Sequence, residues 1–106
     1  MSNKDFKTSR LKYKMFDGTT VEMSLSMILL YRLRAKNKKA YENVSKLLTN
    51  GPKEVIEIAE ILYGAYLCAN LEEEKPTSFE SFLENMNPSY EVNGDYVSQL
   101  ISPKKK

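Results

Sequence analysis

The sequence contains no histidine and only one cysteine, Cys68. Without histidine, the chain lacks the commonest general base and the imidazole that activates serine and cysteine nucleophiles. A structural zinc site uses about four cysteine or histidine ligands, so it is excluded. A lone cysteine forms no internal disulfide, which suits a reducing cytoplasm, and we expect Cys68 to be a small buried apolar residue. We therefore expect a protein that is not an enzyme and that needs no metal or cofactor.

Long apolar runs and glycine-rich loops are missing as well. The longest uncharged run covers residues 61–71, which is shorter than the roughly 18–20 residues of a membrane-spanning helix. The N-terminal residues carry charges and have no apolar signal-peptide region. The glycines stand singly at positions 18, 51, 64 and 94, so no phosphate-binding loop is present. We expect a soluble, intracellular protein that does not contact a membrane.

The length, hydrophobic content and net charge of the chain fit one small globular domain. The chain has 106 residues, which is enough for one modest core, and 42% of them are hydrophobic. The net charge is +2 with acids and bases interspersed, which gives no strong field for nucleic acid. We predict a disordered N-terminal arm over residues 1–10, a single domain over residues 11–101 and a basic tail over residues 102–106.

Residues 11–23 predict a β-hairpin with Asp17-Gly18 in its turn. A two-residue loop mixes apolar and charged side chains on both faces of the hairpin. A three-residue loop over residues 16–18, with Gly18 left-handed, gives one apolar and one polar face, so we predict this register. The predicted pairs are Leu11 with Met23, Lys12 with Glu22, Tyr13 with Val21, Lys14 with Thr20 and Met15 with Thr19.

Helical periodicity follows the hairpin, which makes the fold class α+β, mostly α: an N-terminal β-hairpin followed by four to five helices. The first helical stretch begins after Ser24 or Ser26, and a break near Asn37 is left open. Asn50-Gly51 ends the second stretch, and Pro52 opens the next. A capping box at Thr77 begins a short helix over residues 78–86, and a last helix covers residues 89–101.

The helix predicted after Pro52 is apolar around most of its circumference. Apolar side chains fill roughly 240° of arc, against the ~100° typical of a surface helix. Two interpretations remain open, because this helix is either the centre of the core or the carrier of surplus apolar surface for a partner. On the second interpretation, the protein-binding residues are Tyr63, Tyr66, Leu67, Phe79, Phe82 and Tyr90.

The basic segment over residues 32–39 supports an alternative function. Arg32, Lys36 and Lys39 share one helical face, and Arg34 and Lys38 share another, as in a small DNA-binding regulator. Acidic residues elsewhere nearly cancel this charge. We expect a solvated helix end here and no contact with nucleic acid.

Five stretches of the sequence carry a family resemblance. They are YKMFDGTTVEMSLS, AYENVSKLLTNGP, EILYGAYLCANLEEE, SFESFLENMNPSYE and the late VSQLI. In this order and spacing, over about residues 11–101, the chain resembles the small tail assembly chaperones of siphophages that infect Gram-positive bacteria. The likeness rests on a pattern and brings no motif-defined binding residues with it.

The resemblance implies a function in the host bacterial cytoplasm. Proteins of this family bind the tape measure protein and keep it soluble while tail tube protein polymerises around it, and they are absent from the mature virion. Many are also made in a longer form by ribosomal frameshifting, for which the codons of Lys104, Lys105 and Lys106 are a suitable place. We expect weak helix-in-groove binding of the tape measure protein at several sites, with self-association into oligomers as a further expectation.

Overall fold

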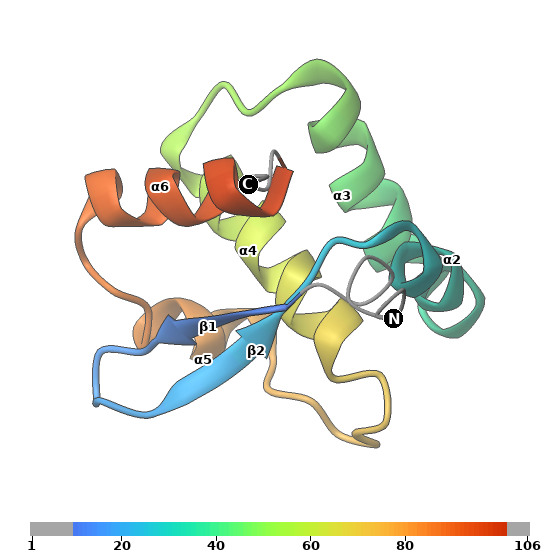
Figure 1. The fold of residues 1–106 in the computed structure, drawn as a ribbon, viewed down its shortest axis with the longest axis horizontal. Coiled ribbons are helices and arrows are strands. Elements are labelled where there is room, and N and C mark those ends of the chain that lie inside the picture. Colours follow the sequence, from blue (N-terminus) through green and yellow to red (C-terminus); the bar gives the residue numbers. More distant parts are fainter. Residues whose placement is uncertain (1–9, 102–106) are drawn as a thin grey trace, which may run out of the picture.

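The computed structural model describes residues 10–101 (Figure 1). The elements run in the order β1 (Leu11–Lys14), β2 (Thr20–Met23), α2 (Met27–Lys36), α3 (Lys38–Asn50), α4 (Val55–Ala69), α5 (Phe79–Glu84) and α6 (Tyr90–Ile101). The fold is therefore α+β and mostly helical, with a two-stranded antiparallel hairpin followed by five helices, as predicted. The predicted basic tail and, apart from Arg10, the predicted N-terminal arm lie outside the described residues.

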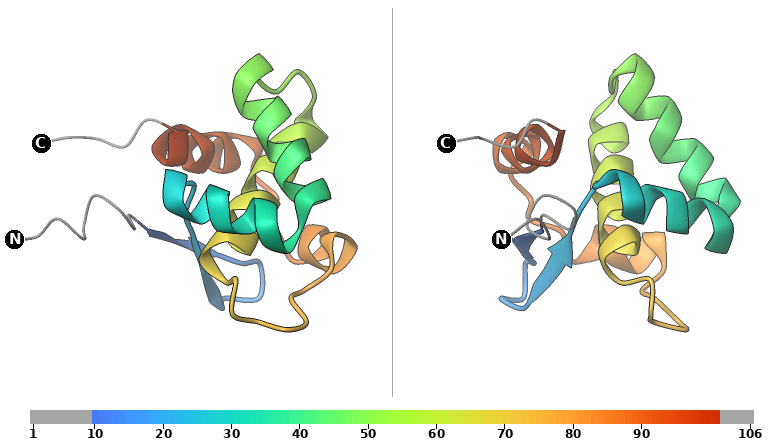
Figure 2. Two further views of the ribbon diagram at one scale, coloured as in Figure 1. Left: turned by 90° about the vertical axis from the view of Figure 1, so that its right-hand side faces the viewer. Right: turned by 45° about the vertical axis from the view of Figure 1, so that its right-hand side comes forward.

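Helix α4 lies in the centre of the fold. Figures 1 and 2 show α6 on one side of it and α2 and α3 on the other, with the hairpin and α5 packed towards its C-terminal half. Ile61, Leu62 and Ala65 are fully buried, and Cys68 is 1% exposed. Each large aliphatic side chain buried here contributes about 1.5–3 kcal/mol. The first of the two interpretations of this helix is therefore right for its C-terminal half, which forms the centre of the core.

The hairpin has the predicted register. Leu11 pairs with Met23 and Tyr13 with Val21, which turns Tyr13 and Met23 into the core, where both are fully buried. The loop closes through a 2.8 Å hydrogen bond from the Met15 amide to the Thr19 carbonyl, and Gly18 has a φ of 93°. That left-handed conformation suits glycine because it has no Cβ. The choice of the register with one apolar face is confirmed.

The helix ends show which signals in the sequence are decisive. Asn37 separates α2 from α3, since its non-helical backbone ends one helix while its side chain accepts a hydrogen bond from the Ala40 amide of the next. Gly51, with a φ of 82°, ends α3 as predicted. Pro52 does not open the next helix; α4 begins at Val55, after Glu54. The predicted start is wrong because the Glu57 side chain caps the backbone amides of residues 53 and 54.

The cap of α5 also differs from the prediction. Ser78 is the N-cap, and its hydroxyl accepts a 3.2 Å hydrogen bond from the Ser81 amide. The Thr77 backbone is used elsewhere, because its amide donates to the Tyr66 hydroxyl and its carbonyl accepts from the Tyr63 hydroxyl. These two bonds tie the chain before α5 to the side of α4, so the helix starts one residue later than the capping box predicts.

Helices α3 and α4 cross closely at Gly64. A Cβ at this position would lie 2.8 Å from Cγ2 of Val44, which is 1% exposed. Real Cβ atoms do not approach a neighbour so closely, and the buried valine has little room to move. The glycine is therefore needed for the close packing of the two helices.

A buried polar cluster joins the hairpin to α6. The Tyr13 hydroxyl donates a 2.7 Å hydrogen bond to Oδ1 of Asn93 and accepts a 2.9 Å bond from the Asn87 amide. The Asn93 side chain in turn donates to the Asn87 carbonyl at 2.8 Å. Burial raises the pKa of Tyr13, partly offset by the hydrogen bond from Asn87. Because its members are paired with one another, the cluster holds β1, the chain before α6 and α6 itself in one arrangement.

Candidate protein-binding grooves

Three of the predicted protein-binding residues lie in the core. Tyr66, Leu67 and Phe82 are 5%, 6% and 1% exposed. The rings of Tyr66 and Phe82 stack with their centroids 5.6 Å apart, because α5 folds back over α4. In this conformation these three side chains, which were expected to bind a partner, present little surface.

Tyr63 and Phe79 lie at the edge of the same aromatic cluster and are half-buried. Their ring centroids are 5.2 Å apart, and the Tyr63 hydroxyl donates a 2.8 Å hydrogen bond to the Thr77 carbonyl. Burial, with a smaller contribution from Tyr66, raises the pKa of Tyr63. Both residues line a hollow of about 640 Å³ between α3, α4 and α5, which we call the α3–α4 groove. Its other lining residues are Asn37, Lys39, Ala40, Glu42, Asn43, Lys46, Glu60 and Gly64.

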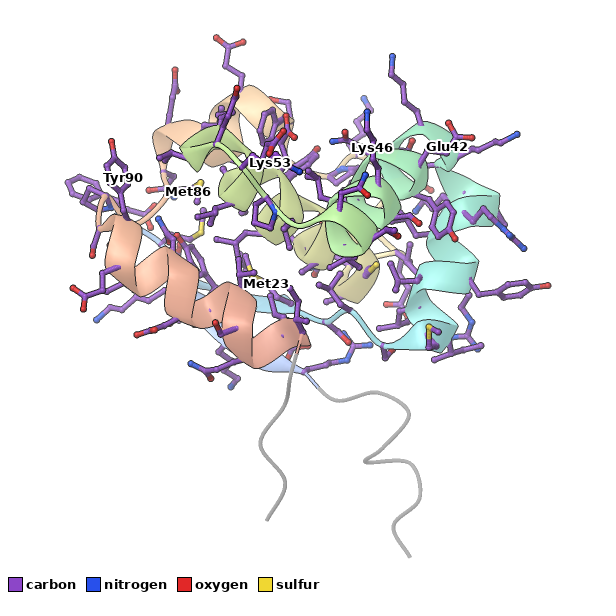
Figure 3. All side chains as sticks on the ribbon, turned by 90° about the horizontal axis from the view of Figure 1, so that it is seen from above. Met23, Glu42, Lys46, Lys53, Met86 and Tyr90 are labelled. Carbon is purple, nitrogen blue, oxygen red and sulfur yellow. The ribbon has the colours of Figure 1, made fainter. Side chains whose placement is uncertain are left out.

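Tyr90 lies on a different surface and is 71% exposed. It borders a hollow of about 560 Å³ on the other side of α4, which we call the α4–α6 groove. Its lining residues are Phe16, Val55, Ile56, Ile58, Ala59, Leu83, Glu84, Met86, Asn87, Pro88, Tyr90 and Asn93. Figure 3 shows Tyr90 and Met86 at one end of the molecule, where α6 begins, and Glu42 and Lys46 of α3 on the opposite side of α4. The six predicted residues are thus divided between the core and two separate grooves.

The α4–α6 groove is the more apolar of the two at its rim. Phe16 is 70% exposed, Val55 54% and Ile56 42%, and together with Tyr90 they surround it. By contrast, the rim of the α3–α4 groove carries Lys39, Glu42, Lys46 and Glu60. Large apolar side chains that gather at one exposed site mark a surface for another molecule.

Hydrogen bonds hold the walls of the α4–α6 groove in place. The Phe16 amide donates to the Asn85 carbonyl at 2.8 Å, and the Asp17 amide donates to the Asn85 side chain at 3.1 Å. Asn87 and Asn93, which line the groove, belong to the buried cluster around Tyr13. The hairpin turn, the end of α5 and the start of α6 are therefore linked, so the groove is formed before any partner binds.

Acidic residues occur in and next to the segments that form this groove. Glu84 lines it, and Asp17, Glu54 and Glu91 are exposed next to Phe16, Val55 and Tyr90 in the sequence. Hydrogen bonds from the Thr19 backbone and side chain lower the pKa of Asp17, so this group is ionised at neutral pH. The nearest basic residue along the chain to any of these four is Lys53, beside Glu54. The groove therefore has a largely apolar lining, to which Glu84 contributes one carboxylate.

A smaller apolar patch covers the outer face of α2. Met27 is 83% exposed and Tyr31 63%, and one helical turn separates them. The guanidinium of Arg34 lies 5.6 Å from the ring centre of Tyr31 and 5.7 Å from that of Tyr41.

Three of the five basic side chains in residues 32–39 contact other groups of the same molecule. Arg34 packs on two tyrosine rings, and Lys38 lies 4.0 Å from Glu42. The Lys36 ammonium donates to the carbonyls of Leu71 and Glu73, the latter at 3.0 Å. A phosphate-tracking surface needs these charges free and on one face, so the contacts do not favour the DNA-binding alternative.

The groove residues that the sequence did not reveal are Phe16, Val55 and Ile56. Phe16 was predicted to lie in the hairpin loop. A loop has no strand or helix periodicity from which the direction of its side chain could be predicted. Val55 and Ile56 are next to Glu54 and Glu57 in the sequence. These glutamates led to the prediction that this part of the helix faces solvent with a polar edge. The usable signal was a pair of adjacent β-branched residues in the first turn of a helix, where fewer elements cover the side chains.

Within residues 10–101, no group of three or more histidine, cysteine, aspartate or glutamate side chains is arranged to hold a metal ion. Burial raises the pKa of Cys68 to about 12, so its thiol is protonated and inaccessible at neutral pH. None of the helices of this part of the chain has the length and hydrophobicity needed to cross a membrane. The arrangement provides surfaces for binding.

Comparison with family models, with curated proteins and with solved structures found no match to this chain.

Proposed function

We propose that this protein is a chaperone that binds apolar faces of helices in an unassembled client and keeps that client soluble. The observation that carries the proposal is the set of exposed apolar side chains around the α4–α6 groove: Phe16, Val55, Ile56 and Tyr90. A helix that lies in an apolar groove is a recurring mode of peptide recognition. We do not propose a catalytic role.

The resemblance to siphophage tail assembly chaperones names the client. We propose the tape measure protein, with tail tube protein displacing the chaperone as it polymerises. The proposal places the protein in the cytoplasm of the bacterial host and leaves it out of the mature virion. The lysine codons proposed for frameshifting belong to residues 104–106, outside the described residues.

One shallow groove supports only modest affinity, and this suits the proposed role. The rim side chains are exposed before binding, so a client helix gains apolar burial without unfolding the chaperone. Several copies on one long client raise the overall avidity while each contact remains easy to displace. Self-association on the client is part of the proposal.

Co-expression with the tape measure protein tests this function. The wild-type chaperone is expected to raise the soluble fraction of the client and to co-purify with it. Tyr90→Asp places a charge at the groove and is expected to abolish both effects, because burying an unpaired carboxylate is costly. Gln99→Asp, on an exposed position of the same helix, is the matched control and is expected to behave as wild type.

Four results bear on the proposal. A client that stays insoluble with the wild-type chaperone contradicts it. Equal solubilisation of the client by Tyr90→Asp and by wild type would show that the α4–α6 groove is not the binding surface. Detection of the protein in purified particles favours a structural tail component instead. A salt-dependent gel shift of DNA by the protein alone favours the DNA-binding regulator, in which residues 32–39 carry the function.

A further inference from the structure

We propose that the apolar patch on the outer face of α2 docks an amphipathic helix of a second protein, one whose apolar side chains are flanked by aspartate or glutamate. The reason is an exposed apolar stripe on α2 that is bordered on both sides by arginine. Figures 1 and 3 show α2 at the end of the molecule opposite to the start of α6, where Tyr90 lies. This surface is separate from the α4–α6 groove, so the inference goes beyond the proposed function and does not rest on it.

The apolar stripe follows from the helical periodicity of α2. Met27, Tyr31 and Ala35 are spaced by four residues, so they lie along one line on the helix surface, with Ile28 beside it. Met27 is 83% exposed, Tyr31 63% and Ile28 37%. The buried leucines of α2 lie on the opposite face, against the core. The helix has thus packed one apolar face and leaves a second one for another molecule.

Two exposed arginines border this stripe. At 100° per residue, Arg34 lies about 60° from Tyr31 on one side, and Arg32 lies about 100° from it on the other. The Arg34 guanidinium is held over the rings of Tyr31 and Tyr41, 5.6 and 5.7 Å from their centres. Stacking uses the flat face of a guanidinium and leaves the N–H groups at its edge to bind a carboxylate. Arg34 is therefore a positioned cation at the edge of an apolar surface.

The acidic residues nearest along the chain do not cancel this charge. Residues 24–41 contain none. The first on either side are Glu22, which pairs with Arg10 at 3.3 Å, and Glu42, which lies 4.0 Å from Lys38. Within the described part of the chain, neither arginine of the stripe forms an ion pair. Their charges are therefore available to a partner.

The elements that pack against α2 do not reverse the sign either. Helix α4 contains no acidic residue after Glu60. The glutamates over residues 72–74 are reached from the other side of α2, since Lys36 lies about 140° around the helix from Tyr31 and donates a 3.0 Å hydrogen bond to the Glu73 carbonyl. The first turn of α2 contains no acidic residue, so the partial positive charge of the helix N-terminus adds to that of the arginines.

An acidic amphipathic helix matches both features of this surface. It supplies apolar side chains for the stripe and carboxylates for both borders. A second copy of this chain in a two-fold pairing would set arginines against arginines. Nucleic acid needs many phosphate contacts for its affinity, and two arginines around a methionine and a tyrosine provide few.

Two synthetic peptides test the inference. Both have about 18 residues, long enough for measurable helicity, and share one leucine stripe; glutamates flank the stripe in the first and lysines in the second. Binding to the full-length protein is measured by calorimetry at about 50 mM and about 500 mM salt. The glutamate peptide is expected to bind about tenfold more tightly at low salt, and the ratio is expected to shrink at high salt because exposed charges are screened.

Charge-reversal variants locate the effect. Arg32→Glu combined with Arg34→Glu is expected to remove or invert the preference, and circular dichroism checks that the fold is retained. Arg32→Gln combined with Arg34→Gln removes the charges without adding new ones and is expected to reduce the ratio even if the reversal disturbs folding. Lys46→Glu combined with Lys53→Glu is the matched control, since it changes the net charge as much as the reversal does, at exposed positions outside α2 (Figure 3). It is expected to leave the preference in place.

Two further variants separate this surface from the α4–α6 groove. Met27→Ser removes apolar surface from the stripe and is expected to weaken binding of the glutamate peptide at both salt concentrations. Tyr90→Asp is expected to leave that binding unchanged, because Tyr90 lies at the other end of the molecule. Loss of binding in Tyr90→Asp would place the peptide in the groove and contradict the inference.

Other outcomes also overturn it. They are equal affinity for the two peptides, a preference for the lysine peptide, and a preference that survives both arginine variants. Oligomers of the protein alone that Met27→Ser dissociates, seen by sedimentation, would identify a second copy as the occupant. Single-stranded DNA that binds more tightly than the glutamate peptide, and is released by the arginine variants, would assign the surface to nucleic acid. Solubilisation of the tape measure protein tests the proposed function independently of all these results.

Discussion

The two ends of helix α4 present apolar side chains in opposite ways. In the C-terminal half, Ile61 and Leu62 are fully buried, and α2, α3 and β2 pack against the helix. In the first turn, Val55 and Ile56 are 54% and 42% exposed and border a groove. The composition of the two segments does not reveal this difference. Coverage by neighbouring elements decides which apolar residues are available to a partner.

Phe82 provides the strongest test of this difference between buried and exposed apolar side chains. This residue is 1% exposed and packs against the rings of Tyr63 and Tyr66 at 5.3 and 5.6 Å. Phe82→Ala is expected to lower the free energy of unfolding by about 3–5 kcal/mol, measured by urea denaturation. That loss is a large part of the total stability of a small domain. Phe79→Ala, on the same helix but half-buried, is expected to cost less than about 2 kcal/mol. Equal costs would contradict the division between core and groove.

The two helical glycines provide the next test. Gly64→Ala is expected to destabilise by about 1–3 kcal/mol in thermal or urea unfolding, since the new methyl meets Val44 in the core. Helix propensity alone predicts a gain of about 1 kcal/mol. Gly94, in α6, has nothing within 4 Å of an added Cβ, so Gly94→Ala is expected to stabilise by about 0.5–1 kcal/mol. A stabilising Gly64→Ala would show that α3 and α4 are less closely packed than described.

Tyr13→Phe tests the buried cluster that holds the groove walls. Removal of the hydroxyl leaves Oδ1 of Asn93 and the amide of Asn87 without this partner, at an expected cost of about 1–3 kcal/mol. The variant is also expected to loosen the groove, because both asparagines line it. Amide hydrogen exchange at the start of α6 measures this second effect, and unchanged protection there would contradict the link.

The same residue sets an alkaline limit on stability. Burial raises the pKa of Tyr13 in the folded protein above its ordinary value of 10.0, so the unfolded chain releases this proton first. Its contribution to stability is therefore fully present below pH 10 and is lost as the pH rises through the folded value. Wild type is expected to lose stability above pH 10 more steeply than Tyr13→Phe. Parallel pH profiles of the two proteins would show that Tyr13 does not carry the effect.

The smallest effect on stability is expected at the groove itself. Val55→Asp changes an exposed residue in the first turn of α4, where a carboxylate also complements the helix dipole. The free energy of unfolding is expected to stay within about 0.5 kcal/mol of wild type. Ile61→Asp, further along the same helix, is expected to unfold the protein, because it buries an unpaired carboxylate. Unfolding of Val55→Asp would mean that the groove is part of the core.

Much of the fold followed from local rules in the sequence. The hairpin register was fixed because only one pairing separates apolar from charged side chains, and Gly51 marked the end of α3 through its left-handed backbone. The start of α4 and the cap of α5 were missed. In both places a contact decided the boundary: Glu57 with the preceding amides, and Thr77 with the hydroxyls of α4.

The candidate site was only partly predictable. Tyr90 is exposed beside apolar residues, whereas Tyr66 and Phe82, which were expected at the surface because they belong to strongly apolar segments, are buried. Those segments are the ones that neighbouring elements cover. Exposure depends on how α5 and α6 pack against α4, and the periodicity of a single helix carries no information about that packing. Phe16 was missed for a related reason, since its loop reaches the groove only through contacts with the end of α5.

Site-specific photocrosslinking in the presence of the proposed client, the tape measure protein, tests the central claim most directly. A photoreactive amino acid is placed at position 55 or 90 of the α4–α6 groove, or at position 31 of the α2 patch, all of them exposed in the free protein. Our account predicts crosslinks to the client from positions 55 and 90 and few from position 31. Crosslinks from position 31 alone would contradict it and move the binding surface to α2.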